Sequence, residues 1–184
     1  FEQGLRTLLR QDPDVIMIGE IRDQPTARIA VQAGLTGHLV ISTLHCGRAT
    51  GVFARLIQMG IEPYLVASSI RAALAQRLVR RLCPTCRAQR GEEAAAGSGN
   101  TAPRRWYEPV GCADCDGLGY HGRIGLFELI EMDEKLRHMI LAQASETELQ
   151  QYAAESGTRN LADDAADKVT AGWTSREEVM GAIE

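Results

Sequence analysis

The sequence has 184 residues, of which 45% are hydrophobic and 24% charged, and its net charge is −4. This composition is typical of a globular protein with one core, or one core and a small satellite, and the acidic balance argues against nucleic-acid binding. No apolar run approaches the roughly 20 residues that cross a bilayer, and the first residues do not resemble a signal peptide. Five cysteines, four of them in two CxxC pairs, favour a reducing compartment and a bound metal over a disulfide framework.

The first elements along the chain are a strand, a helix and a strand. A continuous apolar run at residues 15–18 predicts a strand that is buried on both faces and therefore parallel to its neighbours. A helix is expected to begin at Asp23, with Pro25 in its first turn, and to stop at Gly34. A second buried strand follows at residues 39–44.

Two helices and a further strand are expected next. The apolar residues of the stretch 49–57 fall on one helix face, and Gly60 ends that helix. Pro63 opens another helix, which is expected to run through Ala73. Residues 76–82 fit either a helix end or a strand, and we expect a strand. The alternation of strands and helices predicts an α/β fold with a parallel sheet and right-handed crossovers.

The composition changes at Cys83. Residues 91–103 are small and polar, which predicts a flexible loop. Residues 123–130 predict one more strand, and the remainder of the chain is expected to be helical. We therefore divide the chain into an α/β core at residues 1–82, a cysteine-rich segment at residues 83–122, and a strand with a helical tail at residues 123–184.

Capping residues predict where the helices of the tail begin. Ser145 and Thr174 are each followed three residues later by glutamate, which is the pattern of a capping box. Asn160 is a third expected N-cap, and Gly172 is an expected helix stop. The tail is therefore expected to be a small helical bundle.

A carboxylate and an imidazole are expected at the ends of the two N-terminal strands. Ligands bind at the carboxyl ends of strands in open α/β sheets, and Glu20 lies there after the first strand. Such a glutamate can accept a proton from water or orient it beside a phosphate, although a surface glutamate fits this segment as well. His45 follows the second strand and can donate a hydrogen bond to a phosphate, or can be a partly buried structural histidine. For His38, a role at the start of the strand fits equally well.

Several blocks of the sequence resemble the secretion ATPase superfamily. Residues 8–23, from Leu-Leu-Arg-Gln-Asp-Pro-Asp to Gly-Glu-Ile-Arg-Asp, resemble its Walker B region. Residues 35–45, from Leu-Thr-Gly-His to Ser-Thr-Leu-His, resemble its His box. Residues 76–83 and 119–125 match as well, as does the helical tail. The resemblance covers essentially the whole chain and is nearest to the type II secretion ATPase (GspE) family, followed by the PilB-like pilus-assembly ATPases. It implies that residues 1–82 are the C-terminal part of a RecA-like, phosphate-loop ATPase core.

The resemblance implies roles for four residues near the strand ends. Glu20 matches the catalytic glutamate of an atypical Walker B motif, in which Gly19 stands where many phosphate-loop enzymes have aspartate. His45 and His38 match the His box. Glu20 and His45 are therefore the candidate catalytic residues, and Gly19 and His38 are the candidate cofactor-binding residues.

Three neighbouring residues receive no catalytic role from the resemblance. Arg22 and Asp23 match the loop after the glutamate, whose function the resemblance leaves open. Cys46 stands where relatives more often have Thr or Ser, and we interpret it as a packing residue and not as a nucleophile.

The resemblance implies ATP and Mg²⁺ as cofactors of the whole ATPase, which would be a homo-hexamer. It also implies a position on the cytoplasmic face of the bacterial inner membrane, with GspL-like and GspF-like platform proteins as partners. No G-x-x-x-x-G-K-[ST] motif occurs in the sequence, so the chain contains no phosphate-binding loop. We therefore expect that this chain alone does not hydrolyse ATP measurably.

The two CxxC pairs form the second candidate site. Cys83 and Cys86 make the first pair, and Cys112 and Cys115 make the second. Each pair can place two thiolates on one ion, and two pairs complete a tetrahedral site that suits structural Zn²⁺. A redox pair, an iron–sulfur cluster and free thiols are the alternatives. In the resemblance, this segment is the tetracysteine subdomain of assembly-type ATPases.

Two classes of function follow from the sequence. The first is an ATPase subunit that drives pseudopilus assembly in type II protein secretion or, as a variant, type IV pilus assembly. The second is a zinc-binding interaction module without catalysis.

Overall fold

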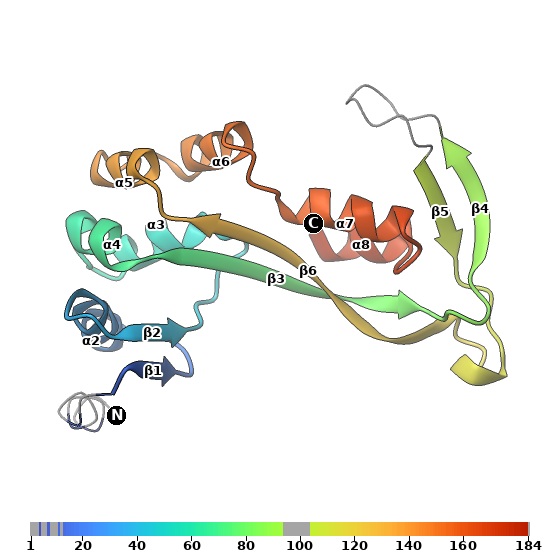
Figure 1. The fold of residues 1–184 in the computed structure, drawn as a ribbon, viewed down its shortest axis with the longest axis horizontal. Coiled ribbons are helices and arrows are strands. Elements are labelled where there is room, and N and C mark those ends of the chain that lie inside the picture. The colour runs from blue at the N-terminus through green and yellow to red at the C-terminus, as the bar shows by residue number, and fades with distance from the viewer. Residues whose placement is uncertain (1–3, 5–6, 8–10, 12, 94–103, 184) are drawn as a thin grey trace. The chain divides into compact units, whose positions relative to one another are not determined.

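The computed structural model describes residues 4, 7, 11, 13–93 and 104–183, and Figure 1 shows its helices and strands. The chain forms two compact units, one of residues 1–75 and 129–158, the other of residues 76–128 and 159–184. The long strands β3 (Ala72–Leu82) and β6 (Tyr120–Glu131) pair with each other and contribute to both units. The three-part division made from the sequence stays a prediction. In the described part of the chain, no helix combines the length and the apolar character that crossing a bilayer requires.

The first unit contains a pair of parallel strands, β1 (Val15–Ile18) and β2 (Leu39–Ser42). Their predicted parallel pairing is confirmed, and β2 ends at Ser42 instead of Leu44. In this register Val15 lies opposite Leu39, so the carboxyl ends of both strands meet at one edge. That edge is where the candidate catalytic residues follow in the sequence.

Only one face of the β1–β2 pair is buried, so the prediction of burial on both faces is wrong for the described structure. Successive side chains point to opposite faces of a strand. Ile16 and Ile18 are buried, whereas Val15 and Met17, on the other face of the same strand, are 54% and 77% exposed. The exposed side of the pair is therefore as apolar as the buried side.

Helix α2 (Gln24–Leu35) packs against β2. It begins as predicted: the side chain of Asp23 accepts a hydrogen bond from the Thr26 backbone N–H at 2.9 Å, and Pro25 lies in the first turn. The helix continues one residue beyond the predicted stop at Gly34. Its buried residues are Thr26, Ala27, Ile29, Ala30, Val31 and Ala33.

Four more helices lie in the described part of the first unit. Helix α4 (Pro63–Ser69) contacts α2, α3 and α5, and α5 in turn contacts α6. The predicted continuation of α4 through Ala73 is wrong, because the chain leaves the helix at Ser69 and enters β3. Ser145 caps α6 through the predicted capping box with Glu148. The bounds are α3 (Gly51–Gln58), α5 (Glu134–Leu141) and α6 (Glu146–Glu155).

The second unit contains an antiparallel hairpin of β4 (Ala88–Glu93) and β5 (Arg104–Glu108). The predicted loop at residues 91–103 therefore begins later than expected, because residues 91–93 belong to β4. Residues 94–103 lie outside the described residues. Gly91 sits beneath the Trp106 ring, and a Cβ atom there would come within 1.9 Å of it.

Two helices close the second unit: α7 (Leu161–Thr170) and α8 (Arg176–Ile183). Asn160 caps α7 as predicted, accepting hydrogen bonds from the backbone of Ala162 and Asp163. The capping box predicted at Thr174 is wrong by one residue. The Ser175 hydroxyl accepts from the Glu178 N–H at 3.3 Å, whereas the Thr174 hydroxyl donates to the backbone carbonyl of Arg80 at 2.8 Å.

An ion pair holds α8 on β3. The Glu178 carboxylate accepts a hydrogen bond from the Arg80 backbone N–H at 3.1 Å and a second from the Arg80 guanidinium. The guanidinium also lies 4.1 Å from the centre of the Tyr120 ring. The hydrogen bond from Arg80 lowers the pKa of the Glu178 carboxyl below its usual value of 4.5. Glu178 therefore stabilises the fold above the usual glutamate pKa, and this stabilisation is lost as the pH falls through the lowered pKa.

We expect Arg80→Ala to lower the thermal midpoint of unfolding by a few degrees at neutral pH. The loss should shrink at acidic pH, because a protonated Glu178 no longer pairs with Arg80 in the parent chain. Thermal unfolding at several pH values measures both effects. Arg123→Ala, an exposed position on β6, is the matched control. An equal loss for both variants, or a loss that grows with acid, would contradict the role of this pair.

Candidate functional site

The structure brings Glu20 and His45 together at the carboxyl ends of β1 and β2. Glu20 follows β1 by two residues, and His45 follows β2 by three. Because the strands are parallel and neighbouring, both connections leave the sheet at the same edge. The Nε2 atom of His45 lies 3.2 Å from Oε2 of Glu20. An acid and an imidazole thus share one edge of the sheet.

Arg22 engages the other oxygen of the Glu20 carboxylate, at 2.5 Å. Its hydrogen bond is the main reason why the pKa of Glu20 lies below the usual value, and His45 adds a smaller effect in the same direction. The side chains of His45 and Arg22 are 86% and 72% exposed, whereas that of Glu20 is partly buried, at 34% exposure. Glu20 is therefore ionised near neutral pH and accessible to a ligand.

The backbone between these residues is fixed by bonds across the two strands. The Thr43 hydroxyl donates to the Gly19 carbonyl at 2.7 Å, and the Ile21 N–H donates to the Thr43 carbonyl at 3.0 Å. Gly19 is exposed beside Glu20, and a Cβ atom there would meet no other atom within 4 Å. Thr43 was missed as a positioning residue, although its place between the strand and His45 was visible in the sequence.

His38 lies at the opposite end of β2 from His45, because it precedes the first residue of that strand. Its Nδ1 atom is 3.0 Å from the Thr36 hydroxyl and 3.1 Å from the Ala33 carbonyl. These contacts tie the end of α2 to the start of β2. The structure does not bring His38 to the edge that carries Glu20. The contacts of His38 instead agree with the alternative that it has a structural role at the start of the strand.

Cys46 directly follows His45 but faces a packed region. The side chain is partly buried, and burial raises the pKa of its thiol above the usual value. A Cβ atom added at Gly51 would lie 3.6 Å from the Cys46 Cβ. A thiol that is held protonated is a poor nucleophile, which agrees with the packing interpretation.

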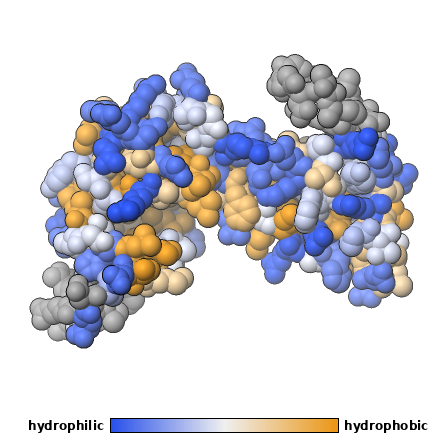
Figure 2. Space-filling model, in the orientation of Figure 1, coloured by the Kyte–Doolittle hydropathy of each residue, from blue (hydrophilic) through white to orange (hydrophobic). Residues whose placement is uncertain are grey.

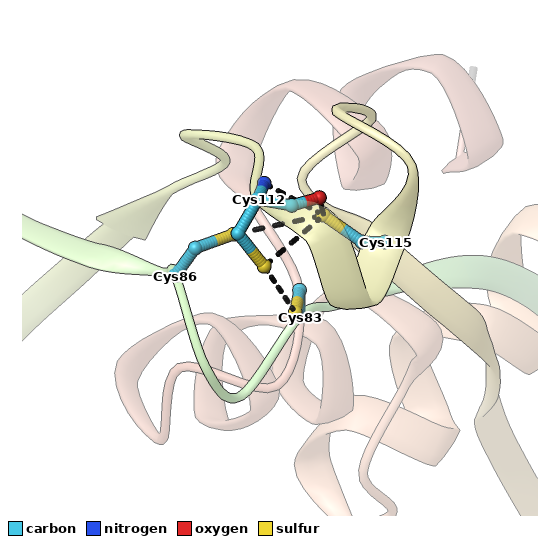
Figure 3. A group of neighbouring side chains, drawn as sticks. All are labelled: Cys83, Cys86, Cys112 and Cys115. Atoms are coloured by element: carbon cyan, nitrogen blue, oxygen red, sulfur yellow. Dashed lines mark hydrogen bonds between the residues drawn. The ribbon is translucent and has the colours of Figure 1, made fainter.

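The four cysteines of the CxxC pairs converge in the second unit, as Figure 3 shows. Cys83 and Cys86 come from the turn between β3 and β4. Cys112 precedes and caps the short 3₁₀ turn at residues 113–115, and Cys115 is the last residue of that turn. Their sulfur atoms all lie within 4.8 Å of one another, with three separations of 3.8 to 3.9 Å. Cys83 and Cys115 are buried and the other two are partly buried. This group could hold one metal ion.

Backbone N–H groups already point at the sulfur atoms. Cys115 Sγ accepts from the N–H groups of Cys112 and Gly119, each at 3.2 Å, and Cys86 Sγ accepts from Gly111 at 3.3 Å. Burial raises the pKa of the Cys115 thiol, but these donors outweigh it and lower the pKa to about 7. Burial and the neighbouring thiols raise the pKa of Cys112 to about 12. The thiolate is the form that binds metals, so the lowered pKa of Cys115 favours metal binding at this cluster.

Two glycines allow the chain to turn closely around the cluster. Gly111 has a φ of +100°, and a Cβ atom there would lie 2.4 Å from the carbonyl oxygen of Gly117. Gly119 has a φ of +75°, and its Cβ would lie 2.4 Å from that of Pro109. Both positions therefore require glycine.

The two turns are linked by a side-chain bond that the sequence analysis missed. The Thr85 hydroxyl donates to the Asp114 carboxylate at 2.9 Å. Thr85 and Asp114 both stand directly before the second cysteine of their CxxC pair. Two polar residues at this same position were the sequence signal that could have predicted the bond. The bond fixes one turn against the other independently of any ion.

Comparisons with known proteins establish the class and then the family. The Legionella pneumophila ATPase DotB, known from an X-ray structure, superposes with a TM-score of 0.67 at 23% identity, covering 97% of this chain and 41% of DotB. Together with the strand-end site, this likeness defines the chain as part of a RecA-like secretion ATPase fold, with a four-cysteine cluster. The predicted fold class is confirmed. The chain belongs to the Type II/IV secretion system protein family, whose model matches residues 1–181.

Curated relatives agree with this family. Type II secretion system protein E of Pseudomonas aeruginosa is 50% identical over 98% of this chain. The type IV pilus assembly ATPase PilB of Myxococcus xanthus is 46% identical, also over 98% of the chain. The chain spans 36% of the first relative and 33% of the second, about a third of their lengths. The predicted resemblance to both branches is confirmed.

Proposed function

We propose that this chain is the part of a type II secretion ATPase that activates water and senses the terminal phosphate of ATP. The observation that carries the proposal is the 3.2 Å approach of His45 to Glu20 at the carboxyl ends of two parallel strands. Glu20 would accept a proton from the attacking water or orient it, and His45 would donate a hydrogen bond to the γ-phosphate. Gly19 would leave room beside the carboxylate for the nucleotide.

Several parts of this function lie outside the chain. The proposed ATPase works as a homo-hexamer on the cytoplasmic face of the inner membrane, with GspL-like and GspF-like platform proteins as partners. ATP and Mg²⁺ would be held mainly by a phosphate-binding loop elsewhere in the longer protein, where Mg²⁺ neutralises the developing phosphate charge. Hydrolysis would power pseudopilus assembly. Type IV pilus assembly is the alternative, supported by the likeness to PilB.

We further propose that the metal ion is zinc in a structural role. Zinc–thiolate bonds of about 2.3 Å in a tetrahedron place the sulfur atoms about 3.8 Å apart. Three sulfur separations of 3.8 to 3.9 Å fit this arrangement. Four thiolates leave no open coordination position, so the ion would hold the fold and would not take part in hydrolysis. His38, at the far end of β2, would contribute at most indirectly to nucleotide binding.

A hybrid protein tests the ATPase proposal. This chain replaces the matching third of the Pseudomonas aeruginosa relative, and phosphate release is measured with Mg²⁺ and ATP. We expect turnover by the hybrid and none above the blank by the chain alone, which has no phosphate-binding loop. Turnover by the chain alone, or a folded and zinc-loaded hybrid without turnover, would contradict the proposal. The second result would favour the zinc-binding interaction module, a function that the four-cysteine cluster supports by itself.

A further inference from the structure

Helix α8 is held on the second unit without a buried side chain of its own. None of its eight residues, all of which the structure describes, is buried, whereas α7 buries Leu161, Ala165 and Val169. Much of the surface of this unit that Figure 2 shows is hydrophilic. Isolated helices shorter than about 12 residues are marginal in water. The position of α8 therefore depends on the contacts at its start.

Hydrogen bonds gather at the corner between α7 and α8, which we define as residues 171–175. The Arg87 guanidinium donates a hydrogen bond to the Gly172 carbonyl. The hydroxyl groups of Tyr120 and Ser175 share a hydrogen bond at 2.9 Å. Two residues that lie far from the corner in the sequence thus hold its first and last parts.

A cation–π pair adds a third contact directly after the corner. Arg176 is the first residue of α8, and its guanidinium lies 4.0 Å from the centre of the Trp106 ring. Trp106, Arg87 and Tyr120 all belong to the cysteine-rich segment, residues 83–122. The start of α8 is therefore docked on the segment that carries the four cysteines.

The backbone of Arg87 belongs to the turns that converge on the sulfur atoms. Arg87 directly follows Cys86, and its N–H donates to the Cys83 carbonyl at 3.0 Å. The Cys83 N–H donates to the Gly119 carbonyl at 2.9 Å, and the Gly119 N–H donates to Cys115 Sγ at 3.2 Å. An ion that closes the four cysteines would therefore also fix the position of Arg87.

Strand β3 also contacts the corner, independently of the cysteines. The Leu82 N–H donates to the Trp173 carbonyl at 2.9 Å, and Glu178 of α8 pairs with Arg80. The Arg80 side chain is 56% exposed, and ion pairs at exposed sites contribute little to stability. These contacts would keep residues 171–175 beside β3, but they are too few to hold all of α8.

We propose that the four-cysteine centre controls the docking of α8, with Arg87 as the positioning residue that connects the two. When an ion closes the cysteines, Arg87 fixes the corner and α8 stays docked; without the ion, α8 is released. The inference rests on the proposed structural zinc ion. Coupling between two sites is reciprocal, so the docked corner raises the affinity for the metal by the same factor.

Amide hydrogen exchange, measured by NMR on the chain with zinc, after removal of zinc by EDTA, and after zinc is added back, tests the release of α8. Without zinc, we expect exchange in α8 to quicken by about tenfold or more, and zinc should restore the slow rate. Exchange in α7 should change much less, because Asp164 and Lys168 bond this helix to β6. In the zinc-loaded chain, Arg87→Ala should release α8, whereas Arg90→Ala, which removes an ion pair with Glu108, should not.

The outcomes separate this inference from the proposed zinc ion. A chain that binds zinc but shows the same exchange in α8 with and without it overturns the inference alone. The inference is also overturned if α8 stays protected in zinc-loaded Arg87→Ala. A chain that binds no zinc overturns both proposals.

Zinc affinity, measured by competition with a chromophoric chelator, tests the reciprocal effect. Gly172 has a φ of +69°, and a Cβ atom there would lie 2.7 Å from the Tyr107 ring and 3.0 Å from Arg87 Nη1. Gly172→Ala should therefore displace the corner and weaken zinc binding by about tenfold, although it alters no cysteine. Gly157→Ala is the matched control, because Gly157 has a φ of +82° and its Cβ would meet nothing within 4 Å. Unchanged affinity in Gly172→Ala, or an equal loss in both variants, would overturn the proposal.

Discussion

Cys112→Ser is expected to loosen the cysteine segment at residues 83–93 and 104–122 while the β1–β2 pair keeps its structure. Structural zinc binds with an apparent free energy of about 10 kcal/mol or more in small zinc-folded peptides, comparable to the stability of a whole domain. The segment carries few buried apolar side chains of its own. Of the buried hydrophobic residues that the structure describes, only Cys83 and Cys115 lie in this segment. Metal removal by a chelator should have the same effect as the substitution.

Hydrogen exchange followed by mass spectrometry measures this result, together with the metal content of the purified chain. Exchange should rise strongly from Cys83 to Gly119 and remain unchanged in β1 and β2. Cys46→Ser is the matched control, because Cys46 lies in the first unit and outside the cluster. If the metal is lost while exchange in the cysteine segment stays the same, the ion has no structural role.

Glu20→Gln is expected to reduce the turnover number of the hybrid ATPase by about 10²- to 10⁴-fold, the usual contribution of a general base. Glutamine keeps the size of the side chain and can still contact His45, but it cannot accept a proton from water. The Michaelis constant for ATP should change little, because Glu20 would act on the attacking water and not on nucleotide binding.

Phosphate release at saturating and limiting ATP separates these two effects. Glu131→Gln is the matched control, since Glu131 is an exposed glutamate at the end of β6. Turnover that survives Glu20→Gln within about threefold would remove Glu20 from the general-base role, because such a change is far below the usual contribution of that group. A large rise in the Michaelis constant with unchanged turnover would assign Glu20 to binding instead.

The sequence by itself determined the features that depend on near neighbours in the chain. Helix caps such as Asp23 and Asn160 bond to N–H groups two or three residues away, so their patterns are visible without a fold. Each CxxC pair likewise carries its spacing in four consecutive residues. The short apolar runs ending in Glu20 and His45 predicted two parallel strands and their shared edge, because parallel strands align their carboxyl ends.

The tertiary structure decided everything that depends on residues far apart in the chain. The helix predicted through Ala73 ends at Ser69, because β3 begins at Ala72 and pairs with β6. Local sequence propensity carries no information about that pairing. Ser175 caps α8 because Thr174 is drawn to the carbonyl of Arg80, 94 positions away. The open apolar face beside Val15 is a further fact of the tertiary structure. Burial depends on which segments pack together in the fold. A run of apolar residues has the same sequence whether both faces of its strand are covered or one is exposed, so the sequence alone does not predict the burial of each face.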